Sequence, residues 1–250
     1  MLARAPRLLL RLLNGTARGA LLAVCFWLAV PGGVRADTIA SARYTEPTDR
    51  YAHGVLGDAI EWGALELTLT DGRISTFTLP IDHVFEDVAP RLADLDGDGA
   101  PEVIVVESDV NAGAALVVYG PAGKITETPH IGTRNRWLAP IGAADLDGDG
   151  VVEIAFIDRP HLAKTLHVWR YQAGALSQVA TLRGVTNHRI GEADIAGGIR
   201  TCAGSPEMIV ATANWAQLVA ITWMADGFET RAIGTDTSRP AFARAMECDD

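Results

Sequence analysis

The sequence is poor in the features on which most catalytic sites depend. It has three cysteines and contains no Cys-x-x-Cys pair, glycine-rich phosphate loop, His-Glu-x-x-His helix or serine nucleophile elbow. Its six histidines share neither a repeat position nor a metal-ligand spacing; they are His53, His83, His130, His161, His167 and His188. These absences argue against zinc, phosphate-loop and serine-hydrolase chemistry, and they indicate structural or surface roles for the histidines.

Long hydrophobic runs are also scarce. The apolar run from Leu21 to Val30 is too short to cross a bilayer as a permanent helix. It follows four arginines with no acidic residue among them and precedes Val34-Arg35-Ala36, so we predict an export signal over residues 1–36 with cleavage after Ala36. A lipid anchor at Cys25 is the weaker alternative, because Val24 stands where a small residue is needed. The mature chain, residues 37–250, is therefore expected to be periplasmic or extracellular, with no membrane span after signal removal.

Positive charge is in short supply. The chain has 21 basic and 31 acidic residues, and the predicted signal removes five arginines, which leaves 16 basic residues and a formal charge of −15. A chain this acidic is a poor partner for nucleic acid. Eight of the acidic residues fall in two nearly identical loops, which favours neutralisation by a metal ion over a merely solvated surface.

Only two cysteines, Cys202 and Cys248, remain after signal removal. In an oxidising compartment two such cysteines are expected to pair. Cys202 belongs to a predicted loop, and Cys248 directly precedes Asp249, which marks the same end of the next predicted strand. We therefore predict a Cys202–Cys248 disulfide.

The chain repeats itself with a period near 50 residues, as the blades of a propeller do. A hairpin glycine recurs at Gly72, Gly123, Gly174 and Gly227, and an aspartate after a short strand recurs at Asp58, Asp94, Asp145, Asp194 and Asp249. Between these marks lie apolar runs of strand length, at 103–106, 115–119, 154–157, 166–169, 208–211 and 218–223. We predict an all-β fold, a β-propeller of four to five four-stranded blades, closed by pairing of residues 39–44 with residues 243–248.

The two acidic loops carry the strongest chemical signal. Asp94-Leu-Asp-Gly-Asp-Gly-Ala-Pro-Glu102 recurs as Asp145-Leu-Asp-Gly-Asp-Gly-Val-Val-Glu153. Carboxylates at alternate positions converge only if the chain turns sharply, and the two glycines of each loop permit that turn. Such an oxygen-rich set suits calcium. The predicted ligands are Asp94, Asp96, Asp98 and Glu102 with the Ala100 carbonyl, and Asp145, Asp147, Asp149 and Glu153 with the Val151 carbonyl.

An EF-hand is excluded because its twelfth position needs glutamate, whereas Val105 and Phe156 stand there and strands follow the loops. With an acid at the ninth position and a strand after it, the pattern resembles the FG-GAP/VCBS repeat family over most of residues 45–250. The resemblance implies a propeller with calcium loops between the inner and second strands of a blade. The family usually has aspartate where Glu102 and Glu153 stand, which leaves open whether these glutamates bind directly or through water.

Two further segments look like degenerate copies of the loop. Asp194-Ile-Ala-Gly-Gly198 keeps only the first acid, with Glu207 marking the following strand, so this copy is expected to bind no metal. Asp58 opens a shorter unit without an acidic cluster and is expected to cap a turn.

These features favour a non-catalytic binding or scaffold module with calcium as its cofactor. The alternative is an enzyme that uses the propeller as a platform, for example one acting on polysaccharide. The partner, a protein or a glycan, is expected at the end opposite the acidic loops, on arginine and aromatic side chains: Arg50, Arg136, Trp137, Arg189 and Arg239. The competing interpretation is that these arginines pair with neighbouring acids across blades.

Overall fold

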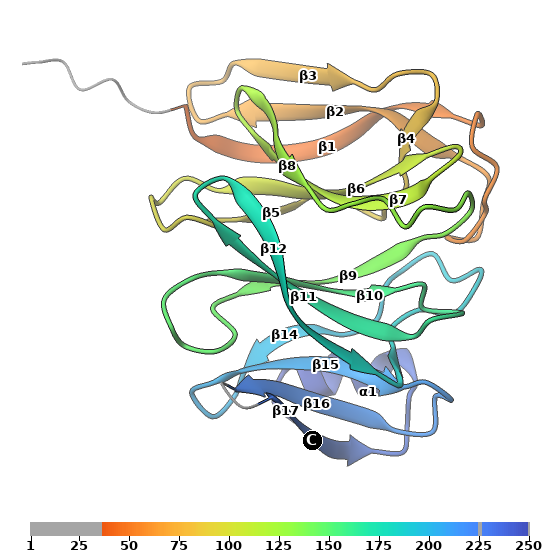
Figure 1. The fold of residues 1–250 in the computed structure, drawn as a ribbon, viewed down its shortest axis with the longest axis vertical. Coiled ribbons are helices and arrows are strands. Elements are labelled where there is room, and N and C mark those ends of the chain that lie inside the picture. Colours follow the sequence, from red (N-terminus) through yellow and green to blue (C-terminus); the bar gives the residue numbers. More distant parts are fainter. Residues whose placement is uncertain (1–36, 225–226, 250) are drawn as a thin grey trace, which may run out of the picture. The chain divides into compact units, whose positions relative to one another are not determined.

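Antiparallel strands make up almost all of the regular structure in the computed structural model, which describes residues 37–224 and 227–249 (Figure 1). The predicted signal, residues 1–36, lies outside the described residues. The strands are β1 Ile39–Thr48, β2 Glu61–Leu69, β3 Ile74–Thr78, β4 His83–Phe85, β5 Arg91–Ala93, β6 Glu102–Asp109, β7 Gly113–Gly120, β8 Gly123–Glu127, β9 Leu138–Ala144, β10 Glu153–Asp158, β11 Thr165–Gln172, β12 Ala175–Arg183, β13 Val185–Thr186, β14 Gly198–Thr201, β15 Pro206–Thr212, β16 Leu218–Met224 and β17 Gly227–Gly234. One helix follows them in the described part of the chain, α1 Arg239–Met246.

The strands form three sheets. The first has eight strands, because β4 pairs with β2 at Trp62↔Phe85 and with β6 at residues 107–109, and so joins the β1–β3 group to the β5–β8 group. The second sheet runs β9-β10-β11-β12, and the third runs from β13 and β14 through β15 and β16 to β17. The predicted all-β class is correct, and the arrangement is compatible with a β-propeller.

The predicted hairpin glycines lie where tight turns connect neighbouring strands. Gly72 follows β2, Gly123 and Gly227 begin β8 and β17, and Gly174 precedes β12. All four have positive φ, at 86°, 130°, 133° and 74° respectively. Glycine adopts this conformation without steric cost, so the sequence period of these residues directly reports the spacing of the hairpins.

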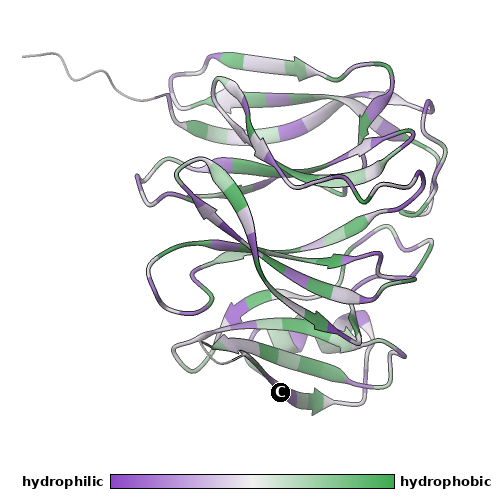
Figure 2. Ribbon diagram, in the orientation of Figure 1, coloured by the Kyte–Doolittle hydropathy of each residue, from purple (hydrophilic) through white to green (hydrophobic). Residues whose placement is uncertain are grey.

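Hydrophobic cores lie between successive groups of strands. Along β6, Ile104 and Val106 pack toward β9 and β10, while Val103 and Val105 pack toward β1 and β2, as the two-residue period of a strand requires. Strands β6 and β7, which have cores on both faces, are buried almost throughout, whereas the outer strands β3, β8, β12 and β17 consist of exposed and half-buried residues. In Figure 2, apolar residues follow the strands and polar residues gather at the turns.

The predicted closure of the first strand against the last segment is wrong. Strand β1 pairs with β2, and residues 239–246 form α1, whose Phe242 packs with Ile209 and Leu218 on the last sheet. The Ser238 side chain accepts a hydrogen bond from the N–H of Ala241, and Pro240 stands in the first turn. Both are helix-start signals, and they outweigh the short apolar pattern that suggested a strand.

Three further observations concern a disulfide, the turn at Asp58 and the helical structure. The structure contains a Cys202–Cys248 disulfide with a Cα–Cα distance of 5.7 Å. Asp58 does not follow a strand, but its Oδ1 accepts a hydrogen bond from the N–H of Ile60, which is the expected turn-capping role. None of the described helical structure has the length and hydropathy required to cross a membrane.

Candidate functional site

Both acidic loops connect the first strand of a repeat to its second strand. One joins β5 to β6 and the other joins β9 to β10, at the same end of the strands (Figure 1). The register is equivalent in the two places, since Glu102 pairs with Ala93 and Glu153 pairs with Ala144. The antiparallel strands therefore hold the two loops in the same orientation relative to their sheets.

Each loop is turned around its first aspartate. Asp94 Oδ1 and Oδ2 accept hydrogen bonds from the N–H groups of Gly97 and Gly99 at 2.9 and 3.0 Å. Asp145 does the same with Gly148 and Gly150 at 2.8 and 2.9 Å. All four glycines have φ between 76° and 88°, and a Cβ at any of them would meet no atom within 4 Å. Backbone conformation, not crowding, is therefore the reason for glycine here.

The turns bring three of the four predicted carboxylates of each loop together. Asp94, Asp96 and Glu102 each place an oxygen within 4.8 Å of the others, and so do Asp145, Asp147 and Glu153. The fifth-position aspartates, Asp98 and Asp149, are outside these groups. Each instead accepts a hydrogen bond from the N–H of the seventh-position residue, at 2.7 Å from Ala100 and 2.9 Å from Val151.

The ninth-position glutamates are buried at the base of the loops. Glu102 is 8 % exposed and Glu153 is 0 % exposed. The Oε2 atoms accept hydrogen bonds from the N–H groups of Leu95 and Leu146 at 2.9 and 3.0 Å, which ties the start of each second strand to its loop. Burial raises the pKa of both glutamates, and Asp96 raises that of Glu102 further.

The two loops differ in one basic side chain, which is present beside the second loop and, among the described residues, absent beside the first. In the second loop, Arg170 of β11 lies 2.7 Å from Glu153, 2.8 Å from Asp147 and 3.0 Å from Asp149. Continuing the pairing Val103↔Tyr119 by one step places Gly120 opposite Glu102, where the second repeat has Arg170 opposite Glu153. Within the described residues no lysine or arginine forms an ion pair with the four acids of the first loop.

The last repeat lacks an acidic loop, and the predicted position of its degenerate copy is wrong. Asp194 precedes β14, so the connection between the first and second strands is the short segment 202–205 instead. Glu207 pairs with Arg200 at the strand position that Glu153 occupies opposite Ala144. Arg200 and Arg231 neutralise it at 2.8 and 2.9 Å. The Cys202–Cys248 disulfide lies at this connection.

The arginines of the predicted partner face lie at the opposite end of the strands, but most are already engaged. Arg50 donates to the carbonyl oxygen of His83. Arg189 stacks over Trp215 at 3.7 Å and lies 3.4 Å from Glu192. Arg239 pairs with Glu192 at 2.5 Å and with Asp194 at 3.0 Å. Arg189 and Arg239 therefore pair with acids, as the competing interpretation expected, but both acids belong to the β13–β14 connection of the last repeat and not to a neighbouring blade.

Trp137 and Arg136 behave differently from these three. Trp137 is 2 % exposed and its indole N–H donates to the carbonyl oxygen of Glu86 at 2.7 Å, so it is a core residue and not a contact platform. Arg136 is half-buried and donates to the carbonyl oxygen of Asn135, and it forms no ion pair with a carboxylate of the described chain. Arg50 likewise donates to a backbone carbonyl and has no carboxylate partner among the described residues, but only Arg136 of these two lines a cavity.

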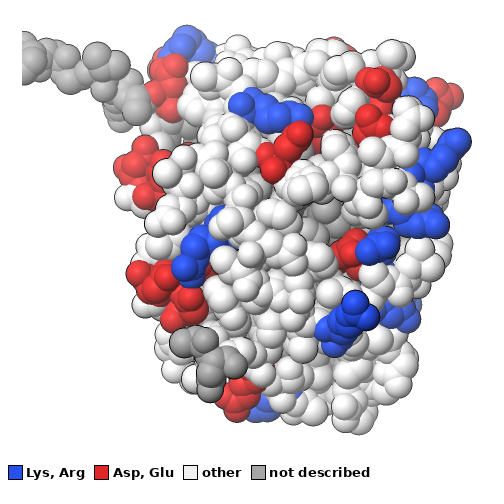
Figure 3. Space-filling model, in the orientation of Figure 1, with Lys and Arg blue, Asp and Glu red and all other residues white. Residues whose placement is uncertain are grey.

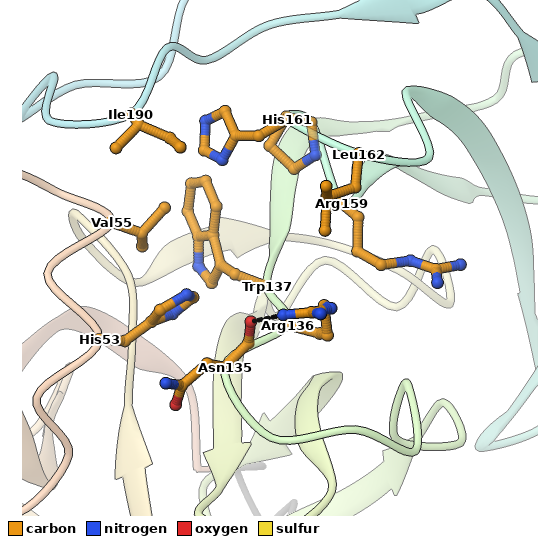
Figure 4. A pocket seen from close by; sticks show the side chains of 10 residues that line it. His53, Val55, Asn135, Arg136, Trp137, Arg159, His161, Leu162 and Ile190 are labelled. Atoms are coloured by element: carbon orange, nitrogen blue, oxygen red, sulfur yellow. Dashed lines mark hydrogen bonds between the residues drawn. The ribbon is translucent and has the colours of Figure 1, made fainter.

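Arg136 and Trp137 line a cavity of about 220 Å³ (Figure 4). The other lining residues come from four separate connections and are His53, Val55, Asn135, Arg159, Pro160, His161, Leu162 and Ile190. Leu162 and Ile190 are 64 % and 72 % exposed, which is unusual for large apolar side chains beside a cavity. Asn135 and Arg159 have φ of 52° and 43°, and strained backbone of this kind clusters at functional sites.

Two imidazoles of the cavity wall are held by hydrogen bonds. His53 Nδ1 lies 2.5 Å from Glu86 Oε1, and Ser108 donates to the other oxygen of this fully buried carboxylate. His188 Nε2 donates to the carbonyl oxygen of Glu192, so its Nδ1 accepts from His161 Nε2 at 3.0 Å. Burial, with His188 and His53 nearby, lowers the pKa of His161 to about 4, and burial also lowers that of His188.

Nothing in the sequence predicted this convergence of His53, His161 and His188. These residues belong to different connections and follow no repeat spacing, so the sequence carries no signal that would group them. In Figure 3, acidic and basic side chains are interspersed over the face shown, with acidic groups at the edge of the acidic loops and several basic groups along the opposite edge.

Comparison with known proteins supports the repeat assignment. Residues 94–156 match the family model described as FG-GAP-like repeat. The match begins at the first aspartate of one acidic loop and ends within β10, so it spans both loops. No curated protein matches the chain.

Proposed function

We propose, from the FG-GAP-like repeat at residues 94–156, that the protein is a calcium-binding β-propeller that serves as a non-catalytic binding or scaffold module in the periplasm or outside the cell. Four groups of strands would be its blades: β1–β3, β4–β8, β9–β12 and β13–β17. Calcium would stabilise the fold at one end of the strands, and the opposite end would carry the partner site.

The observation that carries this proposal is the loop at residues 94–102. The oxygens of three of its carboxylates converge, no histidine or cysteine belongs to that group, and no basic side chain of the described residues pairs with it. Hard oxygen donors of this kind fit calcium, with Asp94, Asp96 and Glu102 as the core of the set and Asp98 and the Ala100 carbonyl completing it. Calcium there would supply the positive charge that the other repeats take from arginine.

The loop at residues 145–153 has the same oxygens but also Arg170. Because the guanidinium already contacts three of its carboxylates, calcium must displace it or share the site. We therefore expect tight binding at residues 94–102 and weaker binding at residues 145–153. This ordering refines the expectation of two calcium ions, one in each loop.

Calorimetric titration of the chelated mature protein tests the proposal. We expect one strong and one weaker calcium site, with Asp96→Asn removing the strong site and Asp147→Asn leaving it intact. Removing calcium should lower Tm by about 5–10 °C at saturating concentrations, since a ligand at 100 times its Kd adds about 2.7 kcal/mol. A stoichiometry near zero, or a Tm indifferent to chelator, contradicts the proposal.

A platform enzyme remains the second candidate because of one observation. An enzyme needs titratable groups gathered at a cavity, and His53 and His161 line this one, with Glu86 and His188 hydrogen-bonded behind them. The binding module is the better proposal because no serine, cysteine or carboxylate lines the cavity as a nucleophile. Turnover of a polysaccharide that is abolished by His53→Asn would favour the enzyme.

A further inference from the structure

We infer that the cavity between His53, Arg136 and His161 binds a compact ligand that carries a carboxylate on an apolar body. The inference deepens the proposed binding-module function by naming the chemistry of its ligand, and the site is separate from the calcium loops. It rests on the charge of the cavity, on its apolar wall and on its size.

The charge of the cavity favours an anion. Arg136 and Arg159 line it, and no aspartate or glutamate of residues 37–224 and 227–249 does. Arg159 is held by Asp158 at 2.7 Å, whereas the one partner of the Arg136 guanidinium within the described part of the chain is the carbonyl oxygen of Asn135. Glu86 lies behind His53 and is tied to it and to Ser108. A carboxylate entering the cavity therefore meets a guanidinium that has no acidic partner among the described residues, and its planar fork suits bidentate binding.

The rest of the wall is apolar. Val55, Trp137, Pro160, Leu162 and Ile190 line the cavity, and Leu162 and Ile190 remain largely exposed beside it. Figure 4 shows Val55 and Ile190 on one side of Trp137 and Arg136 below it, so the apolar wall and the charged group belong to one recess. An inorganic anion would leave Leu162 and Ile190 uncovered, whereas an aliphatic body would bury part of their exposed surface.

The size of the cavity limits the ligand. Its volume of about 220 Å³ corresponds to about seven water molecules at roughly 30 Å³ each. A short aliphatic acid fits these limits, and so does the last residue of a peptide that ends in an apolar side chain. His161 distinguishes these two sources, because its Nε2 donates to His188 and its Nδ1 is left as an acceptor. The amide N–H beside a peptide's terminal carboxylate can donate to this atom.

The test is calorimetric titration of the mature protein with hexanoate and with N-acetyl-leucine, against the neutral hexanamide and N-acetyl-leucinamide. We expect both acids to bind and both amides to bind at least about tenfold more weakly, since a charge-assisted pair is lost. Tighter binding of N-acetyl-leucine than of hexanoate identifies a peptide terminus as the source, and the reverse order identifies a free acid. Equal binding of acids and amides overturns the inference.

Variants of one loop separate direct contact from general charge. Arg136→Gln should weaken hexanoate binding at least about tenfold, and Arg136→Lys should weaken it less, because the charge remains but the fork is lost. Arg134→Gln is the matched control: it removes the same charge two residues away, from an exposed residue that does not line the cavity. Equal losses in Arg134→Gln and Arg136→Gln overturn the inference, as does an unchanged affinity in Arg136→Gln.

Folding and calcium are controlled separately. Each variant is melted alongside the parent protein, and we expect Tm to change by less than about 3 °C, as for a surface substitution. The titrations are repeated after chelation at a temperature well below the chelated Tm. If carboxylates bind but the calcium titration shows no binding, the proposed calcium sites are refuted and the inference about the cavity is retained. If calcium binds but carboxylates do not, the inference about the cavity is refuted and the calcium sites are retained.

Discussion

The glutamate at the start of the second strand of a repeat has a different set of basic partners in each of three repeats. At the start of the second strand of a repeat stand Glu102, Glu153 and Glu207, and each needs compensation because a carboxylate near the core is costly without a partner. Glu207 has two arginines, Glu153 has Arg170, and Glu102 has none among the described residues. Burial acts to raise the pKa of Glu207, but Arg231 and Arg200 hold it below its usual value, whereas the pKa of Glu102 is raised. The series explains why calcium is expected first at Glu102.

Replacing Arg170 should convert the second loop into a stronger metal site. We expect Arg170→Gln to raise calcium affinity at residues 145–153 by about tenfold or more, because the competing cation is removed while the turn is unchanged. Calorimetry resolves this as a second tight site. Arg183→Gln, an exposed residue of the neighbouring strand β12, removes the same charge and should have little effect. An unchanged affinity in Arg170→Gln would show that Arg170 does not compete with the metal.

The buried Glu61 leads us to predict that the free energy of unfolding depends on pH. It is 2 % exposed, and burial, followed by the nearby Glu86, Asp58 and Asp87, raises its pKa from 4.5 to about 9. Between these values the unfolded chain has lost this proton and the folded chain keeps it, so the free energy of unfolding falls as pH rises through the window. Glu61→Gln, which mimics the neutral form, should raise Tm at pH 8 by about 5 °C and leave it nearly unchanged at pH 4.

The control for that experiment is Glu229→Gln, which replaces an exposed glutamate of β17. Its melting should follow the parent protein at both pH values, since an exposed carboxylate has nearly the same environment in the folded and unfolded chains. A Tm for Glu61→Gln that is lower than the parent's at pH 8 would mean that Glu61 acts as a carboxylate in the folded protein.

At the scale of elements, the connection between the first and second strands carries an acidic loop or a disulfide in three of the repeats. Two repeats have an acidic loop there, and the last has the short segment 202–205, whose Cys202 is bonded to Cys248 after α1. Helix α1 covers the last sheet through Ala241, Phe242 and Ala245. The disulfide thus fastens the helix to the repeat that has no metal loop, at the strand end where the others have one.

Removing the disulfide should loosen α1. The two cysteines are 46 residues apart, and in the chain-entropy model closing such a loop stabilises the folded state by about 4 kcal/mol. We expect the Cys202→Ala, Cys248→Ala double variant to melt about 10 °C below the parent protein. Reducing the parent protein should reproduce this loss and should not affect the double variant further; two free thiols in the exported protein, measured by mass spectrometry, would contradict the pairing.

At the scale of the whole molecule, the two ends of the strands have separate roles. The acidic loops and the disulfide lie at one end, and the cavity with its histidines and Arg136 lies at the other. The sheets between them share continuous cores, so stability supplied at one end is transmitted to the other by packing. Calcium is therefore expected to support the cavity without touching it.

Hydrogen exchange should reveal this division. After chelation we expect amide protection to fall most in β5, β6, β9 and β10, whose ends the acidic loops join, and least in β15 and β16, which the disulfide and α1 support. Mass spectrometry of peptides from the mature protein measures this pattern. A uniform loss across all repeats would indicate that calcium stabilises the molecule only as a single cooperative unit.

The sequence by itself determined the features that depend on local geometry. Hairpin glycines, apolar strand runs and the acidic loops report conformations within a few residues, and the Gly72, Gly123, Gly174 and Gly227 series is found at the turns it predicts. Only the tertiary structure decided that residues 239–246 form a covering helix, that Trp137 is buried, and that His53, His161 and Arg136 share a cavity. Those outcomes depend on which sheet faces meet, and side chains from distant connections become neighbours only after the sheets have packed.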